Sequence, residues 1–289
     1  MIVSSPPSAD GLLLTTTHLT AALFTTNGAA LLEDLLQRGV SAGASLVEVF
    51  AERTDHLGLL AEQDNITSVN PSFACGAGIR VFRGERDGFV STNDLSRDGL
   101  TRALEQALAM LGLEIGTRDS AAGFQGLRAL INHAATKEDW LQRCPSMAAA
   151  GDRLKQGTAH LERLGKHLQV RRGSYSRDWQ EVLVAASDGT FARDIRLHQS
   201  TGLSVLAADG DYRASIGRRY GSTDRPEDLV NWNSETSATE VCESAGKMLR
   251  ADYVEAGQMP VVLANRFGGV IFHEACGHLL ETTQIERGT

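Results

Sequence analysis

The residues best suited to chemistry lie close to the end of the printed sequence, in the run His273-Glu274-Ala275-Cys276-Gly277-His278. Imidazoles bind Zn²⁺ and similar divalent ions well, and a Glu beside a metal-held water can serve as a general base. Two histidines and an acid within six residues therefore form a candidate metal site. The alternative is that His273 packs within an apolar helix and His278 caps or solvates the end of that helix.

The spacing of the two histidines sets a geometric condition on this site. The familiar HExxH arrangement places two histidines four residues apart on one helix face, whereas here they are five apart. Five residues of a regular α-helix turn through about 500°, which leaves the imidazoles about 140° apart. A one-residue π-bulge would return both to one face, and we expect Gly277 to permit that distortion.

The elements expected to carry this run are a strand and a helix. Residues 259–264 form a short apolar run that predicts a strand, residues 265–269 predict a turn, and a helix is expected from Val270 onward. We assign residues 256–289 to the start of a metal-bearing C-terminal domain.

Upstream, the periodicity predicts two modules, each built of helices and an antiparallel sheet. Residues 1–115 begin with a Ser/Thr-rich arm over 1–27, then a helix capped by Asn27, several strands, and a second helix opened by Ser96. The run Arg83–Asp87 predicts a hairpin. This order gives the α+β fold class for the first module.

Residues 116–255 repeat that order loosely. Ser146 is expected to open a helix, and four short strands are predicted between residues 168 and 208. Asp188-Gly189 predicts a hairpin between the second and third of these strands. A last helix is expected from Ser237, with Ser237 and Glu240 as a capping box.

Composition bounds the classes of function. The chain has 289 residues, 42% of them hydrophobic and 22% charged, which excludes disorder as the main state. A formal net charge of −8 makes nucleic-acid binding an unfavoured function. No apolar stretch approaches the roughly 20 residues of a membrane span, and residues 1–27 do not resemble a signal peptide. We therefore expect a cytoplasmic protein with no membrane contact, whose four dispersed cysteines are reduced thiols.

A resemblance extends over most of the chain from about residue 30. Residues 257–263 (GQMPVVL) and 269–281 (GVIFHEACGHLLE) are similar to the TldD/PmbA family of metalloproteases, and to its TldD branch, which has an HExxxH motif. Residues 76–81 and 183–190 are similar to further strands of that family. The HEACGH context is the specific part of the match, and the upstream runs support it.

The resemblance implies a zinc-type metallopeptidase that acts on peptides or unfolded segments. His273 and His278 would be the metal ligands, and Glu274 the catalytic base. Glu274 would take a proton from a water that the metal polarises and later deliver it to the leaving amine. Cys276 occupies a position that varies in the family, and we expect it to be a small buried residue rather than a ligand.

The sequence departs from the family in its length. In the TldD pattern the third ligand is a Cys far downstream, whereas this chain stops at Thr289. We expect a sequence truncated at its C-terminus, with the third ligand supplied by a Cys beyond residue 289, because catalytic zinc normally takes three protein ligands. Glu281 and Glu286 are weaker candidates for an oxygen ligand. The alternative is a catalytically inert scaffold or assembly subunit of the same family.

The resemblance also suggests partners. A PmbA (TldE)-type subunit, or a second copy of the chain, would form a dimer that encloses the site. The family's label as a modulator of DNA gyrase raises direct action on DNA, against which the net charge argues.

Overall fold

The computed structural model describes residues 22–24, 28–116, 124–165, 167–265 and 268–282. The chain divides into two compact units, the first ending at Arg250 and the second beginning at Ala251, and each is described by itself. Apart from Ala22–Phe24, the arm expected over residues 1–27 lies outside the described residues, as does the cap expected at Asn27. Within the described ranges, no helix is both long and apolar enough to span a bilayer.

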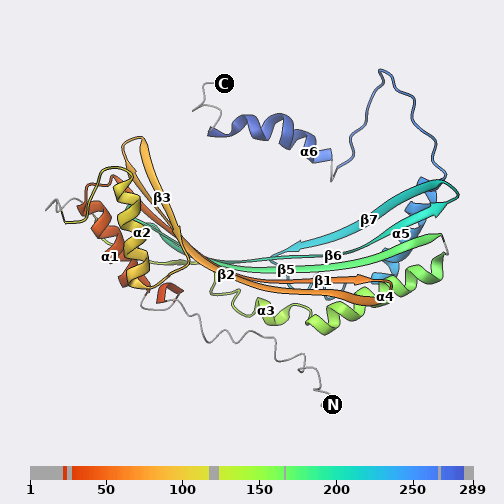
Figure 1. Cartoon of the computed structure of the whole chain (residues 1–289), viewed down its shortest axis with the longest axis horizontal. Helices are drawn as coiled ribbons and strands as arrows, with labels where there is room; N and C mark the ends of the chain where they lie inside the picture. Colours follow the sequence, from red (N-terminus) through yellow and green to blue (C-terminus); the bar gives the residue numbers. More distant parts are fainter. Residues whose placement is uncertain (1–21, 25–27, 117–123, 166, 266–267, 283–289) are drawn as a thin grey trace, which may run out of the picture. The chain divides into compact units, whose positions relative to one another are not determined.

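The strands of the first unit form one sheet (Figure 1). They are β1 (Leu46–Glu62), β2 (Asn65–Arg83), β3 (Arg86–Thr92), β4 (Ile131–Asn132), β5 (Leu168–Ala186), β6 (Phe191–Asp209) and β7 (Tyr212–Thr223). Their order is β3-β2-β1-β5-β6-β4, and β7 also pairs with β6. Every pair is antiparallel except β4 with β6. Helices packed on a largely antiparallel sheet confirm the α+β fold class.

Short turns with left-handed residues join neighbouring strands. The β1–β2 turn places Gln63 and Asp64 at φ 49° and 71°, the two positive values that a type I′ hairpin needs. Gly84 (φ 63°) turns β2 into β3, and Gly189 (φ 94°) turns β5 into β6. Both hairpins expected from the sequence are therefore confirmed.

The helices of the first unit are α1 (Gly28–Ser41), α2 (Arg97–Ala109), α3 (Trp140–Arg143), α4 (Met147–Leu164) and α5 (Ser234–Leu249). Two predicted N-caps are confirmed. The Ser96 hydroxyl accepts the Gly99 N–H at 3.1 Å, and the Ser146 hydroxyl accepts the Ala149 N–H at 3.1 Å. Each cap satisfies a backbone donor that has no partner within its own helix.

The predicted start of α5 is wrong by one turn. The helix begins at Ser234, and the Asn233 side chain accepts the N–H of Thr236 at 2.9 Å. Ser237, expected to be the cap, instead accepts the indole N–H of Trp232 at 2.8 Å. Asn caps a helix as well as Ser does, so a cap one turn earlier competes with the predicted one.

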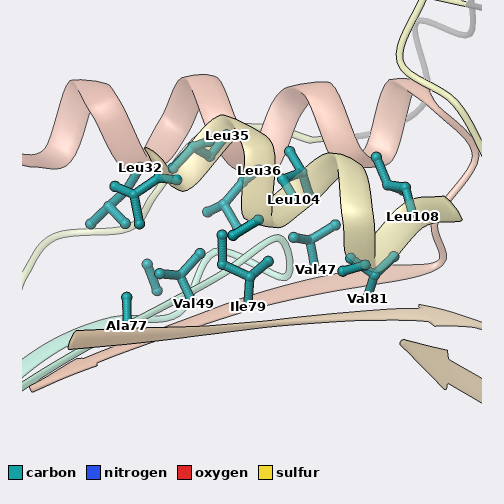
Figure 2. Packing of buried hydrophobic residues seen from close by; sticks show 14 of the residues in the cluster. Leu32, Leu35, Leu36, Val47, Val49, Ala77, Ile79, Val81, Leu104 and Leu108 are labelled. Atoms are coloured by element: carbon teal, nitrogen blue, oxygen red, sulfur yellow. The ribbon is translucent and has the colours of Figure 1, made fainter. Parts of the chain in front are cut away.

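The long helices bury their apolar faces on the same side of the sheet. In Figure 2, α1 and α2 pack over β1 and β2. This cluster includes Leu32, Leu35, Leu36, Val47, Val49, Ile79, Val81, Leu104 and Leu108. Two further clusters place α4 and α5 over other parts of the sheet, and they include Leu57, Leu59, Leu154, Leu161, Leu203, Val205 and Val241. Odd-numbered residues of β1 contribute to both regions, and alternate residues of a strand share a face.

β1 and β5 are continuous, whereas the sequence predicts shorter strands, four of them between residues 168 and 208. Both strands carry charged residues at mid-length. These charges pair across neighbouring strands: Arg53 and Arg193 with Glu181, Arg177 with Asp55 at 2.8 Å, and His56 with Asp178 at 2.7 Å. β1 and β5 pass beneath both groups of helices, so the two groups share one sheet. The division into two modules near residue 115 stays a prediction.

The second unit differs from the prediction in one element. Residues 258–264 have no strand assignment, so the apolar strand expected over 259–264 is wrong. Val261 and Val262 are 72% and 96% exposed. A strand requires a neighbour that completes its backbone hydrogen bonds, and in the described part of this unit no strand pairs with these residues.

Candidate metal centre

The HEACGH run lies on a helix whose winding changes twice. One turn of α-helix, α6 (Gly269–Phe272), is followed by a π turn over His273–Gly277 and a 3₁₀ turn over His278–Leu280. The N–H of His278 donates to the carbonyl of His273, five residues back. That i→i−5 bond defines a π turn, which makes room for one more residue than an α turn.

The π turn brings the two histidines together. Their ring centroids lie 4.7 Å apart, with the ring planes at 75°. On a regular α-helix the same two side chains would diverge by about 140°. The bulge that the spacing requires is thus present in the structure.

Gly277 does not act as we expected. Its φ and ψ are −59° and −51°, ordinary right-handed values that any residue adopts. A Cβ built there would lie 3.7 Å from Nδ1 of His273, an ordinary van der Waals contact. The expectation that glycine permits the distortion is therefore wrong, because the backbone at Gly277 has a conformation and a space that a residue with a Cβ also accepts.

Glu274 completes a group of possible ligands. One ligand atom each from His273, Glu274 and His278 lie within 4.8 Å of one another, and all three residues are exposed. Over the part of the chain that the structure describes, this is the one group of three or more such side chains. Cys276 is outside the group and exposed, so the expectation that it is buried is wrong.

His278 has a carboxylate near each ring nitrogen. Its Nδ1 lies 2.6 Å from Oε1 of Glu281, and its Nε2 lies 3.5 Å from Oε2 of Glu274. Glu281 was weighed from the sequence as an oxygen ligand, but the structure places it against the histidine. Its i, i+3 spacing from His278 is the sequence signal for that contact. Glu286 lies outside the described residues.

The chemistry of this donor set fits a zinc-type ion. Zinc binds imidazole nitrogen and carboxylate oxygen at about 2.0–2.2 Å, which places tetrahedral ligand atoms about 3.3 Å apart. The ligand atoms here spread to 4.8 Å, and rotation of exposed side chains can close that difference. Catalytic zinc takes three protein ligands and keeps one position open. If Glu274 is reserved as a base, this group supplies two.

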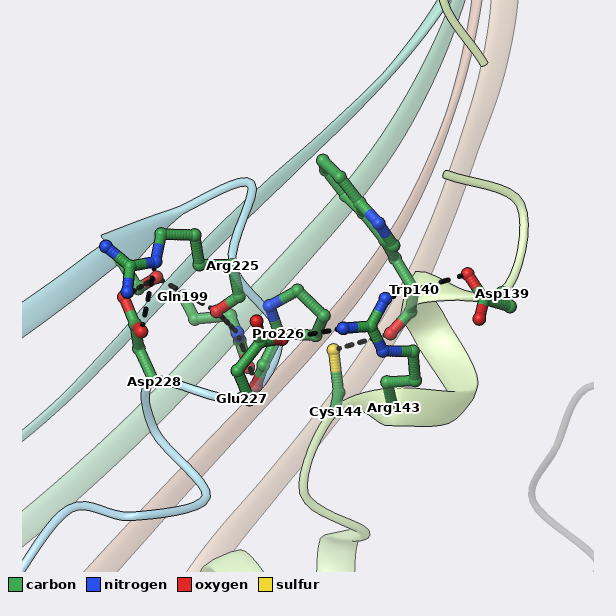
Figure 3. Close-up of polar contacts among 10 residues, drawn as sticks. Asp139, Trp140, Arg143, Cys144, Gln199, Arg225, Pro226, Glu227 and Asp228 are labelled. Atoms are coloured by element: carbon green, nitrogen blue, oxygen red, sulfur yellow. Dashed lines mark hydrogen bonds and ion pairs between the residues drawn. The ribbon is translucent and has the colours of Figure 1, made fainter. Parts of the chain in front are cut away.

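A second reactive side chain, Cys144, is unsuited to nucleophilic chemistry. Burial raises the pKa of its thiol to about 11, and the charges of Arg177 and Arg143 only partly oppose that rise. Its Sγ lies 3.3 Å from the carbonyl oxygen of Trp140 (Figure 3). The nucleophile and metal ligand is the thiolate, so a thiol that stays protonated is inert.

Arg143, beside this cysteine, joins two segments of the first unit. Its guanidinium lies 3.0 Å from a carboxylate oxygen of Glu227, in the segment that follows β7 (Figure 3). It also lies 4.0 Å from Asp139 on its own turn. These contacts connect α3 to the segment that follows β7, and we assign them a structural role.

Comparison with known families gives two matches. The model of PmbA/TldA metallopeptidase domain 1 matches residues 47–111, and the model of the PmbA/TldA metallopeptidase central domain matches residues 133–251. Together they cover more than half of the chain. The HEACGH run lies outside both matched ranges.

Individual relatives agree with the family models. A metalloprotease TldD homolog of Buchnera aphidicola is 24% identical over 267 residues, which are 89% of this chain and 53% of the relative. A solved Thermotoga maritima structure, described as a modulator of DNA gyrase, superposes with a TM-score of 0.60 at 13% identity, over 79% of this chain and 50% of that one. The solved structure of TldE from Thermococcus kodakarensis superposes with a TM-score of 0.51 at 18% identity, over 75% of this chain and 47% of that one. The chain thus spans about half the length of the curated relatives it matches.

Proposed function

The chain belongs to the PmbA/TldD family of metallopeptidases, and we propose that it carries the metal-holding helix of a zinc peptidase that hydrolyses peptides or unfolded segments. The observation that supports this most strongly is the π turn over His273–Gly277, which brings together two imidazoles that an α-helix would separate. π-bulges are rare in helices, and those that do occur are frequently found at functional sites.

Each residue of the group has a role in this proposal. The imidazoles of His273 and His278 hold the ion, which supplies Lewis acidity toward a water molecule and the peptide carbonyl. Glu274 accepts the proton of the attacking water at a carboxylate oxygen and returns it to the leaving amine nitrogen. The resemblance to the TldD branch assigns the third ligand to a Cys beyond residue 289.

The proposal includes a dimer, either with a PmbA/TldE-type subunit or with a second copy of this chain. The fold shared with the solved TldE structure supports a common scaffold for both subunits. A net charge of −8 disfavours direct contact with DNA.

One observation favours a second candidate function, a catalytically inert scaffold or assembly subunit. In the described residues the candidate centre offers two imidazoles besides Glu274, one protein ligand fewer than catalytic zinc normally takes. Such a subunit would keep the fold and bind zinc weakly.

Zinc content and peptide cleavage separate the two functions. The complete protein, with the Cys that the resemblance places beyond residue 289, is loaded with zinc, dialysed and compared with H273A/H278A, and both are assayed on an unfolded peptide with and without a TldE-type subunit. We expect about one zinc per protein chain, lost in the double variant. E274Q should keep the zinc and lose cleavage, because Gln cannot accept a proton from water. Undiminished cleavage by E274Q would remove Glu274 from the mechanism, and equal zinc content in wild type and double variant would favour the scaffold.

A further inference from the structure

The short contact between His278 and Glu281 is unexplained by the roles given so far. Nδ1 of the imidazole lies 2.6 Å from Oε1 of the carboxylate, slightly shorter than the roughly 2.7–2.9 Å of a charge-assisted N–H···O hydrogen bond. Both side chains are about half exposed, at 49% and 52%. Burial therefore does not force them together, and the contact is a local product of the helix end.

The winding of the helix places Glu281 beside His278. The 3₁₀ turn ends at Leu280, and Glu281 follows as the C-cap with φ −72° and ψ 134°. Its N–H donates to the carbonyl of His278 at 3.4 Å. Because the backbone leaves the helix at Glu281, the side chain returns along the last turn to the imidazole.

An ionised carboxylate can only accept a hydrogen bond. Nδ1 of His278 must therefore carry the proton, and in a neutral ring Nε2 then has the free lone pair. Nε2 is also the nitrogen that faces Glu274, at 3.5 Å. That separation is too long for a good hydrogen bond, so the lone pair of Nε2 stays available to an ion.

We propose that Glu281 is a positioning residue, which fixes the orientation and tautomer of His278 so that Nε2 is presented as a metal ligand. This inference rests on the proposed function. Metal-binding histidines commonly donate their second ring N–H to a carboxylate, which fixes the ring and raises its basicity. The two acids of the motif then have separate tasks, since Glu281 orients the ligand and Glu274 remains free to accept a proton.

The test measures zinc affinity and the tautomer of His278 in the 289-residue chain. The variants are E281A, E281Q, E281D and H278A, with E255A as a matched control that removes an exposed carboxylate of the same unit. Zinc affinity is measured by competition with a chromophoric chelator. The tautomer of the metal-free chain is read from ¹H–¹⁵N correlations of the imidazole at about pH 8, where free imidazole is mostly neutral, and H278A identifies the signals. Circular dichroism checks that each variant is folded.

We expect the Nδ1–H tautomer in the wild type and a shift toward Nε2–H in E281A. Zinc affinity should fall about 10- to 100-fold in E281A. The fall should be smaller in E281Q, whose amide oxygen still accepts a hydrogen bond, and absent in E255A. E281D, which keeps the charge but is one methylene shorter, should lie between wild type and E281A.

Two results would overturn the inference. Unchanged tautomer and zinc affinity in E281A would show that the contact does nothing for the ligand. A loss of zinc as complete as that of H278A would show that Glu281 is itself a ligand. If the wild-type chain binds zinc no better than H278A, the proposed function fails and Glu281 has no ligand to position, while the tautomer spectra still report whether it holds the ring.

Discussion

The charged cluster in the middle of the sheet leads to a quantitative prediction for E181Q. Glu181 on β5 is fully buried and accepts a hydrogen bond from Arg53 on β1 and another, at 2.5 Å, from Arg193 on β6. The two arginine side chains are themselves only 16% and 18% exposed. One carboxylate therefore neutralises two largely buried guanidinium groups.

The size of the effect follows from this arrangement. Gln keeps the shape of Glu but removes the charge, which leaves the guanidinium of Arg53 without its buried anion. Arg193 keeps a bond to Glu138 at 2.9 Å. Breaking a buried ion pair by removing one partner costs about 3–5 kcal/mol, a large part of the roughly 5–15 kcal/mol that stabilises a typical domain. We expect E181Q to lower the free energy of unfolding by about that amount.

The matched control is E138Q, which removes the outer partner of the same arginine. Glu138 is 60% exposed, so its pair should contribute no more than about 1 kcal/mol. Both variants are unfolded in urea and followed by circular dichroism and by tryptophan fluorescence, to which Trp179 contributes with its ring 5.4 Å from the Arg53 guanidinium. A loss below about 1 kcal/mol for E181Q, or equal losses for the two variants, would refute the reasoning.

Three further predictions concern the cysteines and Gly277. Burial raises the pKa of Cys144 from 9.0 to about 11, so its thiolate at pH 8 is about 100-fold scarcer than that of an ordinary thiol. Alkylation followed by peptide mass mapping should therefore show that the exposed Cys276 is modified before Cys144. Comparable alkylation rates for the two cysteines would contradict the burial of Cys144. The same pKa shift makes the stability of the fold depend on pH. The stabilisation that the buried, protonated Cys144 thiol provides is complete below the ordinary thiol pKa and is lost as the pH rises toward 11. The urea midpoints of wild type and C144A should therefore converge over that interval. G277A should keep the π turn and bind zinc within about threefold of wild type, because the backbone at residue 277 is right-handed helical and Ala is a better helix former than Gly. A loss of zinc binding comparable to that of H273A would show that the site needs glycine.

Local signals in the sequence predicted the elements whose stabilising contacts are local. Ser96 and Ser146 cap their helices through an N–H three residues away. Gly84 and Gly189 adopt the positive φ that their hairpins require. The histidine spacing predicted a π turn because it is a condition on one helix alone.

The elements that the sequence did not predict correctly depend on contacts between residues far apart in the chain. The sequence predicts shorter strands in place of β1 and β5, whose mid-length charges pair with residues more than 100 positions away, as Arg53 does with Glu181. β7, which the sequence did not predict, has arginines at several exposed positions and pairs with β6 alone among the described strands, so its apolar alternation is weak. Residues 259–264 are as apolar as a buried strand, but pairing rather than apolar character decides whether a strand forms.

X-ray absorption at the zinc edge tests the central claim most directly. If the π turn brings His273 and His278 onto one ion, the zinc-loaded chain should show two imidazole nitrogens at about 2.0–2.1 Å, and H273A and H278A should each lose one of them. A spectrum with no imidazole scattering, or one that either substitution leaves unchanged, would contradict the assignment of this helix as a metal-holding element.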